Sequence, residues 1–141
     1  MITHDDEIRG ILSAAKVIAS VGVSASTEKP SHWIFYYLMQ HEYQVIPVNP
    51  TAGEVFGLKA VADLKAITEK VDVVQIFRRP EDVPPVVEQA IQIGARVVWM
   101  QKGIVNQQAA DRAEAAGLQV VMDRCMMEAH QRLMGGIFTF G

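Results

Sequence analysis

The sequence predicts an α/β fold of the Rossmann type: a doubly wound, parallel, five-stranded sheet between two layers of helices, in three αβα layers. Two observations predict it. Apolar, β-branched runs without polar alternation recur along the chain, as expected for strands that are buried on both faces. Segments with helical spacing separate these runs, and the crossovers are long enough for right-handed βαβ units. Numbered along the chain, the strands are expected in the order 3-2-1-4-5.

The expected strands are apolar runs bounded by polar or turn residues: Val17–Val23, Gln44–Val48, Val71–Phe77, Arg96–Met100 and Gln119–Met122. The expected helices have apolar residues at helical spacing: Asp5–Ala15, Ser31–His41, Pro84–Ile93, Asn106–Ala116 and Met126–Met134. Asn106 is placed to cap the fourth helix and Gly117 to end it. The segment Gly135–Gly141 is expected to be a loosely held end.

Size and charge limit the possible functions. The 141 residues, half of them hydrophobic, are expected to form one domain spanning residues 1–141. A formal net charge of -3 provides no broad basic surface for nucleic acid or anionic membrane. No apolar stretch approaches the roughly 18 residues that span a bilayer, and the acidic N-terminus lacks a signal-peptide core. With Cys125 as its single cysteine, the chain is expected to be cytoplasmic.

A phosphate site is predicted where the first strand turns into a helix. Such a helix start offers unpaired N–H groups and a partial positive charge, and small side chains allow a phosphate to approach the backbone. The candidate residues are small or carry a donor: Gly22, Ser24, Ala25, Ser26, Thr27 and Lys29. The alternative is an ordinary tight turn followed by a helix that Ser31 caps.

The turn after the second strand argues against a nicotinamide cofactor. The dinucleotide fingerprint aligned on Gly22 requires glycines where the chain has Ser24 and Thr27. It also requires an acidic residue at the end of the second strand, and Asn49-Pro50 stands there. An NADP site would need a nearby basic residue, which the segment 49–55 lacks. Asn49 and Pro50 also suit a plain turn.

Two arginines leave the third strand. Arg78 and Arg79 would place fixed positive charge beside the crevice where the strand order reverses, expected between the first and fourth strands. Arginine suits forked contact with phosphate oxygens. Alternatively, the pair is a solvated loop that neutralises Glu81 and Asp82, with Pro80 beginning the next helix.

The remaining strand ends provide weaker signals. After the fourth strand, Gly103 is expected to form a sharp turn and is a candidate cofactor-binding residue, and Lys102 is expected to be either a solvated loop charge or a weak anion contact. Cys125 is expected to pack as a small residue, the alternative being a reactive thiol at a helix start. The histidines lie apart in sequence, and no metal-ligand spacing is present. No catalytic or metal-binding residue is therefore assigned.

Five phrases in order resemble the CoA-binding domain family, which includes the N-terminal domain of the succinyl-CoA synthetase α subunit. They are Val21-Gly22-Val23-Ser24-Ala25-Ser26-Thr27, Val48-Asn49-Pro50, Arg78-Arg79-Pro80-Glu81-Asp82, Gln101-Lys102-Gly103-Ile104 and Val120-Val121-Met122-Asp123-Arg124-Cys125. The resemblance runs from about Lys16 to His130. It is greatest to the small stand-alone members, the YccU-like CoA-binding proteins.

The resemblance implies coenzyme A (CoA) or an acyl-CoA as the ligand. It places Gly22 and Ser24–Thr27 around the phosphates, Asn49-Pro50 beside the nucleotide, and Arg78, Arg79 and Pro80 at the adenosine end or its 3′-phosphate. The synthetase has a lysine soon after this Val-Asn-Pro, where the present chain has Thr51-Ala52, so Lys29 or the arginines would replace that charge.

Binding without catalysis by this chain alone is therefore the expected function. The synthetase continues into a second domain with a phosphorylated histidine, which has no counterpart before Gly141. The alternatives are a small NAD(P)-dependent oxidoreductase, an acyl-CoA ligase component that needs a partner subunit, and a redox regulator in which Cys125 joins the CoA thiol. No nucleic-acid or membrane partner is expected, and an uncovered apolar helix face would favour a homodimer.

Overall fold

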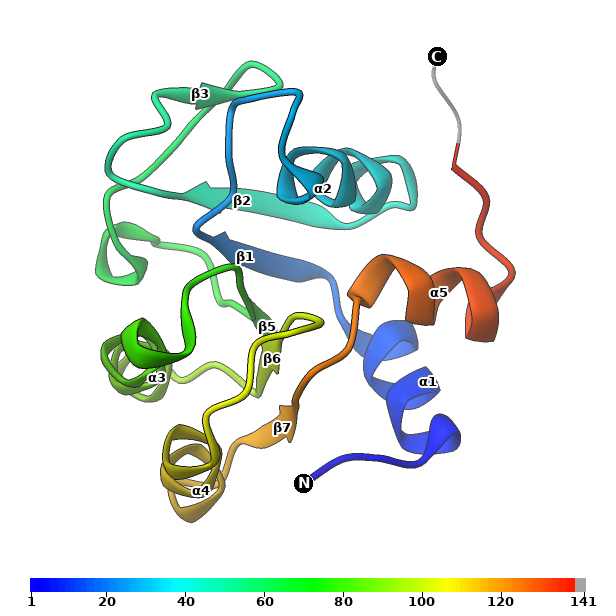
Figure 1. Cartoon of the computed structure of the whole chain (residues 1–141), viewed down its shortest axis with the longest axis vertical. Helices are drawn as coiled ribbons and strands as arrows, with labels where there is room; N and C mark the ends of the chain where they lie inside the picture. Colours follow the sequence, from blue (N-terminus) through cyan, green and yellow to red (C-terminus); the bar gives the residue numbers. More distant parts are fainter. Residues whose placement is uncertain (139–141) are drawn as a thin grey trace.

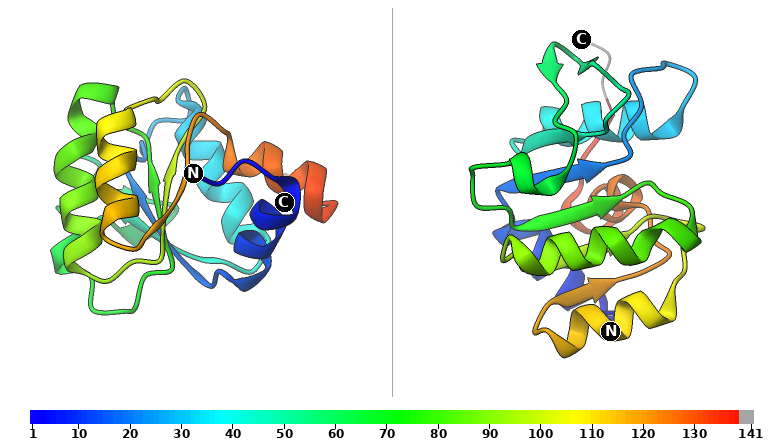
Figure 2. Two further views of the ribbon diagram at one scale, coloured as in Figure 1. Left: turned by 90° about the horizontal axis from the view of Figure 1, so that it is seen from below. Right: turned by 90° about the vertical axis from the view of Figure 1, so that its left-hand side faces the viewer.

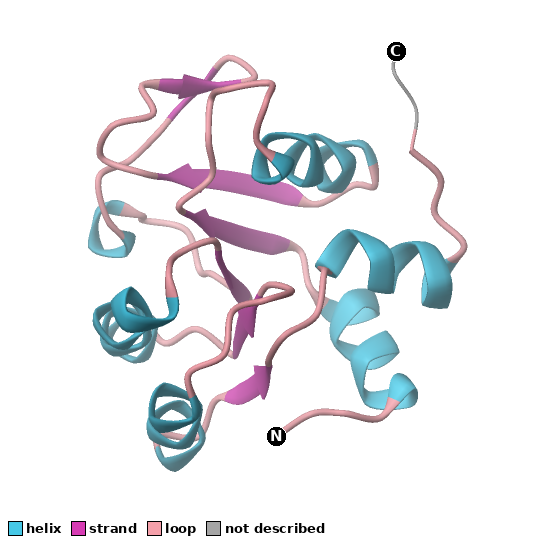
Figure 3. Cartoon of the chain, viewed as in Figure 1, coloured by secondary structure: helices cyan, strands magenta, loops and turns pink. Residues whose placement is uncertain are grey.

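The computed structural model describes residues 1–138 and confirms the predicted fold class. A five-stranded parallel sheet crosses the molecule, with helices on both of its faces (Figures 1 and 3). The strands are β1 (Val17–Val21), β2 (Gln44–Val48), β5 (Val73–Ile76), β6 (Val97–Met100) and β7 (Gln119–Val121). The helices are α1 (Asp5–Ala14), α2 (Pro30–Gln40), α3 (Val83–Gln92), α4 (Gln107–Ala115) and α5 (Met126–Met134).

Two apolar layers hold the sheet. Helices α1, α2 and α5 cover one face, where Trp99 and Phe35 are fully buried, and α3 and α4 cover the other (Figure 2). The first layer consists mainly of large side chains. The second layer is packed closely through alanines such as Ala110 and Ala113 of α4, which allow the helix to approach the strands. Among the described residues, no helix is long and apolar enough to cross a membrane.

The predicted strand order is wrong at one position. The observed order β2-β1-β5-β6-β7 corresponds to 2-1-3-4-5 along the chain, so β5 pairs with β1 and β2 lies at the edge. All four residues of β5 are buried, which suits an interior strand. In β2, the carbonyl of Pro47 accepts a hydrogen bond from Val61 N–H on the outer side (3.0 Å). Proline lacks an N–H to donate and therefore fits an edge strand.

This correction moves the crevice. The strand order reverses between β1 and β5, the first and third strands along the chain, rather than between the first and fourth. The turns that follow β1 and β5 are therefore neighbours. Gly22 and Arg78 lie in these two turns, and the observed order brings them into direct proximity.

Several short elements were not predicted. Strands β3 (Glu54–Val55) and β4 (Leu58–Lys59) form an antiparallel hairpin beside β2, with Phe56 at its tip (Figure 1). Single-turn 3₁₀ helices cover Leu64–Ala66 and Pro80–Asp82. Strands of two residues are too short to show a periodic pattern in sequence.

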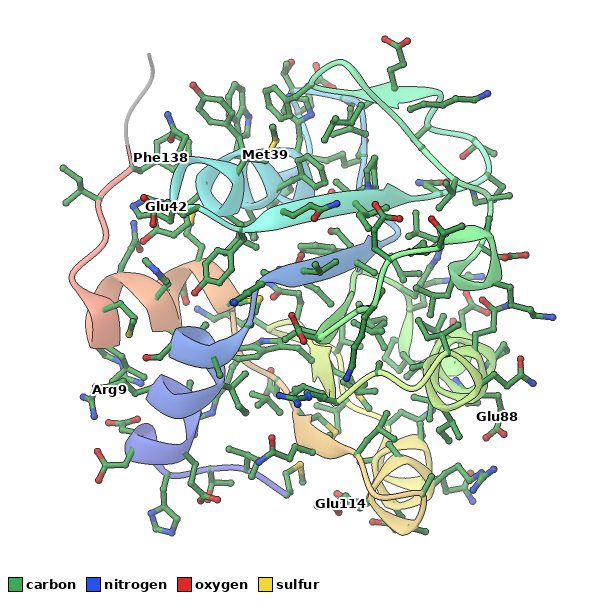
Figure 4. All side chains as sticks on the ribbon, turned by 180° about the vertical axis from the view of Figure 1, so that it is seen from behind. Arg9, Met39, Glu42, Glu88, Glu114 and Phe138 are labelled. Carbon is green, nitrogen blue, oxygen red and sulfur yellow. The ribbon has the colours of Figure 1, made fainter. Side chains whose placement is uncertain are left out.

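The segment that follows α5 contacts α2 and α5. Phe138 packs against the α1–α2–α5 layer, with its ring 6.2 Å from that of Tyr37, and lies beside α2 in Figure 4. A side chain at Gly136 would collide with the Tyr37 hydroxyl and the His130 ring. The expectation of a loosely held end is therefore wrong for residues 135–138. Residues 139–141 lie outside the described part of the chain.

Candidate functional site: a cleft at the carboxyl ends of the strands

A cleft of about 780 Å³ opens where the sheet topology predicts a ligand site. Its walls are the turn after β1, the first turn of α2, the turn after β5, the loop after β6 and the start of α5. Apolar side chains form most of the surface, including Ile34, Ile104 and Met127. Cations also line it: Lys29, Arg78, Arg79 and Lys102. This combination of an apolar hollow with a few polar groups is typical of small-molecule sites.

The structure brings half of the predicted site residues to the walls of this cleft: Gly22, Ser24, Lys29, Arg78, Arg79 and Pro80. The other six are not among the residues that line the cleft. Ala25, Ser26 and Thr27 are exposed in the turn after β1, and Asn49 and Pro50 follow the edge strand β2. Gly103 is exposed in the loop after β6.

Gly22 is required where the turn after β1 meets the turn after β5. Its φ is 89°, a left-handed conformation that glycine tolerates best. A Cβ atom there would collide with the Phe77 carbonyl oxygen and lie 2.9 Å from the carbonyl carbon. The Gly22 N–H donates to the Val48 carbonyl (2.8 Å), which fixes this residue to β2 as well.

The first turn of α2 holds the segment Ser24–Lys29, named here the 24–29 turn. Ser31 Oγ accepts from the Ser24 N–H (3.0 Å), and His32 Nδ1 donates to the Ser24 carbonyl (3.0 Å). Trp33 Nε1 donates to the Thr27 carbonyl (2.9 Å). The helix cap at Ser31, which the alternative interpretation of this turn required, is not present: Lys29 is the N-cap, Pro30 is the first helical residue, and Ser31 Oγ binds the Ser24 N–H.

Two backbone N–H groups of the 24–29 turn are available as hydrogen-bond donors. The Ser26 and Glu28 N–H groups donate to the hydroxyls of Ser24 and Ser26 (3.0 and 3.2 Å). Within residues 1–138, the N–H groups of Ala25 and Thr27 have no hydrogen-bond acceptor. Both residues are exposed, so these amides are free to bind an anion.

Asn49 braces the turn after β1 from the side. Its Nδ2 donates to the Val23 carbonyl (2.9 Å), and its Oδ1 accepts from the Thr51 N–H and hydroxyl (3.1 and 3.0 Å). This arrangement combines a local turn with a long-range contact. The sequence indicated only the turn, because the partner Val23 lies 26 residues earlier.

The two arginines differ. The side chain of Arg79 is 76% exposed and pairs with Asp82 (3.1 Å) and Glu81 (3.4 Å), as the solvated-loop alternative predicts. Arg78 is half-buried with its stem against Gly22, and no carboxylate pairs with it in residues 1–138. Lys29 lines the cleft without an ion pair in the same part of the chain. Sequence gave no means of separating the two arginines.

Three buried polar side chains form a hydrogen-bonded series that ends at Gln101, a residue that lines the cleft. Ser20 Oγ donates to Gln75 Oε1 (3.0 Å), and Gln75 Nε2 donates to Gln101 Oε1 (3.2 Å). Gln101 Oε1 also accepts from the Met126 N–H (3.1 Å) and so satisfies the first turn of α5. Each side chain is at most 3% exposed. This series of hydrogen bonds links β1, β5, the loop after β6 and α5, and it was not predicted from the sequence.

The last two strand ends are tied together. The Gly103 N–H, in a turn with a φ of 85°, donates to Asp123 Oδ1 (2.6 Å). Cys125 is 8% exposed at the start of α5 and contributes to the cleft wall, so it packs as a small residue there. Lys102 and Glu128 form an exposed ion pair across the cleft mouth (3.5 Å).

The histidines do not form a metal site in the described residues. His32 is 6% exposed and holds the 24–29 turn. His41 and His130, distant in sequence, meet beside Tyr37, whose hydroxyl hydrogen-bonds to His130 Nδ1 (2.7 Å). Burial, and secondarily the nearby His41, lower the pKa of His130, whereas burial raises the pKa of Tyr37 to about 12.

The family follows from comparison of this chain with known proteins. The family model described as CoA binding domain matches residues 16–131, which include every wall of the cleft. The chain belongs to the CoA-binding domain family. The uncharacterized protein YneT of Bacillus subtilis (strain 168) is 41% identical over 124 residues, covering 88% of this chain and 92% of YneT.

Solved structures extend the family relation. A hypothetical protein from Pyrococcus horikoshii OT3 superposes with a TM-score of 0.92 at 43% identity, covering 94% of each chain. The dinucleotide-forming acetyl-coenzyme A synthetase 1 of Ca. Korarchaeum cryptofilum superposes with a TM-score of 0.67 at 25% identity, over 77% of this chain and 26% of the synthetase. A similar domain thus occurs in a chain of about this size and as about a quarter of a larger synthetase chain.

Proposed function

We propose that the chain binds coenzyme A, free or acylated, in the cleft at the carboxyl ends of the strands. The CoA phosphates would lie between the 24–29 turn and Arg78, with Lys29 as a mobile cation. The apolar wall formed by Ile34, Ile104 and Met127 would take the less polar parts of the ligand. In this proposal the chain binds CoA and catalyses no reaction by itself.

The observation that carries this proposal is the environment of Arg78. Arg78 is half-buried, has no carboxylate partner in the described residues and lies with its aliphatic stem against Gly22, next to a turn with free amides. Fixed cations and free backbone donors together suit phosphate oxygens. The nearest acidic residues along the chain, Glu81 and Asp82, already pair with Arg79.

Nicotinamide cofactors fit this site less well. Ser24 stands where the fingerprint requires a second glycine, and its backbone N–H and carbonyl are both engaged by α2. Asn49 stands at the position of the ribose-binding carboxylate, and its side-chain amide is already hydrogen-bonded to the backbone of Val23 and Thr51. Both features support CoA over NAD(P) as the ligand.

The test is calorimetric titration of the wild type, Arg78→Ala and Arg79→Ala with CoA, acetyl-CoA, NAD and NADP. We expect CoA to bind, and Arg78→Ala to weaken binding at least about tenfold, equivalent to about 1.4 kcal/mol. Arg79→Ala is the matched control, and its exposed, ion-paired side chain predicts a change below about threefold. NAD(P) binding without CoA binding would overturn the proposal, and equal losses in both variants would refute the role of Arg78.

A further inference from the structure

Phe56, at the tip of the β3–β4 hairpin, contacts His32, which in turn is hydrogen-bonded to the candidate site. Phe56 stacks on the imidazole of His32, with ring centroids 4.3 Å apart and an interplanar angle of 30°. It also stacks on Tyr36 (4.8 Å, 24°), while the Trp33 ring packs perpendicular to that of His32 (4.9 Å, 87°). Phe56 does not line the cleft.

His32 transmits this contact to the backbone of the 24–29 turn. Its Nδ1 donates to the Ser24 carbonyl, so Nδ1 carries the proton. An imidazole can rotate about its χ2 bond, and this hydrogen bond exists in only one ring orientation. The Phe56 ring stacked on His32 and the Trp33 ring perpendicular to it contact the imidazole, and such ring contacts oppose its rotation.

The hairpin is built to hold Phe56 in place. Its strands pair at Glu54–Lys59 and Val55–Leu58, and the Ala60 N–H donates to the Gly53 carbonyl (2.8 Å). Val55 is 1% exposed and anchors the hairpin in the core. Phe56 itself has a φ of 49°, uncommon for a bulky residue, and is only partly buried. The anchoring is therefore done by Val55, which leaves the Phe56 ring to pack on α2.

We infer that Phe56 is a positioning residue for the 24–29 turn and acts through His32. The inference rests on the proposed function, because it concerns how that turn is prepared for a phosphate ligand. Without the ring, His32 would sample other orientations and the Ser24 carbonyl would lose its partner for part of the time. The neighbouring free amides of Ala25 and Thr27 would then be less well ordered for binding.

The first test is a double-mutant cycle on CoA affinity with Phe56→Leu, His32→Gln and the double variant. Phe56→Leu preserves apolar volume but removes the flat ring, and we expect it to weaken CoA binding about fivefold, while the double variant binds no more weakly than His32→Gln. Leu58→Ala, at an exposed site in the same hairpin, is the control and should change affinity less than about twofold. Phe56→Tyr keeps the ring and should bind as the wild type does. Additive effects would overturn the inference.

The second test needs no ligand and remains informative if CoA does not bind. Nitrogen-15 NMR of the His32 side chain and of the Ala25 and Thr27 amides should show a single Nδ1–H tautomer and sharp amides in the wild type. In Phe56→Leu, the His32 signals should average between tautomers and the two amides should shift or broaden. Unchanged His32 and turn signals in a folded Phe56→Leu variant would overturn the inference, whereas a wild type that fails to bind CoA refutes the proposed function alone.

Discussion

Gly22 shows how one residue fixes the shape of the cleft. The chain leaves β1 there in a left-handed conformation, and the Phe77 carbonyl occupies the space that any side chain would need. The turns after β1 and β5 can meet only because this position has no Cβ. Sequence indicated a glycine turn at this point, but the obstacle comes from a strand more than fifty residues later.

Gly22→Ala is expected to lower the free energy of unfolding by about 3 kcal/mol, since backbone strain and a collision with backbone atoms add together. Gly94→Ala is the matched control. Gly94 also has a positive φ (74°), but nothing lies within 4 Å of its added Cβ, so a loss of about 1 kcal/mol is expected. Urea denaturation measures both values. Equal losses would show that the close approach to Phe77 does not matter.

Single residues also mark the limit of inference from sequence. Arg78 and Arg79 are adjacent and chemically identical, yet one is exposed and ion-paired and the other lies against Gly22. That difference depends on how the turn after β5 approaches the turn after β1. The local sequence pattern contains no information on how the two turns approach each other. The sequence therefore predicts two arginines beside the crevice, but not which of them is exposed and ion-paired.

At the scale of elements, local signals predicted most helices and strands. Asn106 was expected to cap α4, and its Oδ1 does accept from the Ala109 N–H (2.9 Å). The predicted order 3-2-1-4-5 is that of the common dinucleotide-binding fold and places β2 inside the sheet, although Pro47 favours an edge strand. The β3–β4 hairpin was missed because its strands are too short to show alternation.

Gln101, in the loop that follows β6, accepts a hydrogen bond from the first residue of α5, Met126. We expect Gln101→Leu to lower the free energy of unfolding by about 2 kcal/mol, because Gln75 Nε2 and the Met126 N–H lose their shared acceptor. Hydrogen exchange at the Met126 amide should accelerate. Gln107→Leu, at an exposed site in α4, is the control and should leave stability within about 0.5 kcal/mol of the wild type. An unchanged Met126 exchange rate would contradict the role of Gln101 as acceptor for the Met126 N–H.

At the scale of the whole molecule, tertiary structure creates groupings that no local pattern predicts. Tyr37, His41 and His130 come from α2, its C-terminal end and α5, and they meet under Gly136. The spacing of 93 residues between Tyr37 and His130 could not be anticipated from sequence.

This grouping predicts a pH dependence of folding stability. The pKa of His130 is lowered in the folded chain by burial and by His41, so the unfolded chain binds its proton more readily. The contribution of neutral His130 is fully present above the ordinary histidine pKa of about 6.5. It is lost as the pH falls from there through the lower native pKa. We therefore expect urea denaturation to show a steeper loss of stability between about pH 7 and pH 5 in the wild type than in His130→Gln. Parallel profiles would refute this assignment.

The edges of the sheet have one further consequence. Val61 occupies the outer edge of β2 at Val48 and Pro47, and the Ile2 N–H donates to the Val120 carbonyl on β7 (2.8 Å). Open edge strands are the usual templates for strand-to-strand aggregation, and both edges here are partly obstructed. We therefore expect strand-to-strand association through these edges to be disfavoured. If two copies do associate, helical surfaces rather than a continuous intermolecular sheet would join them.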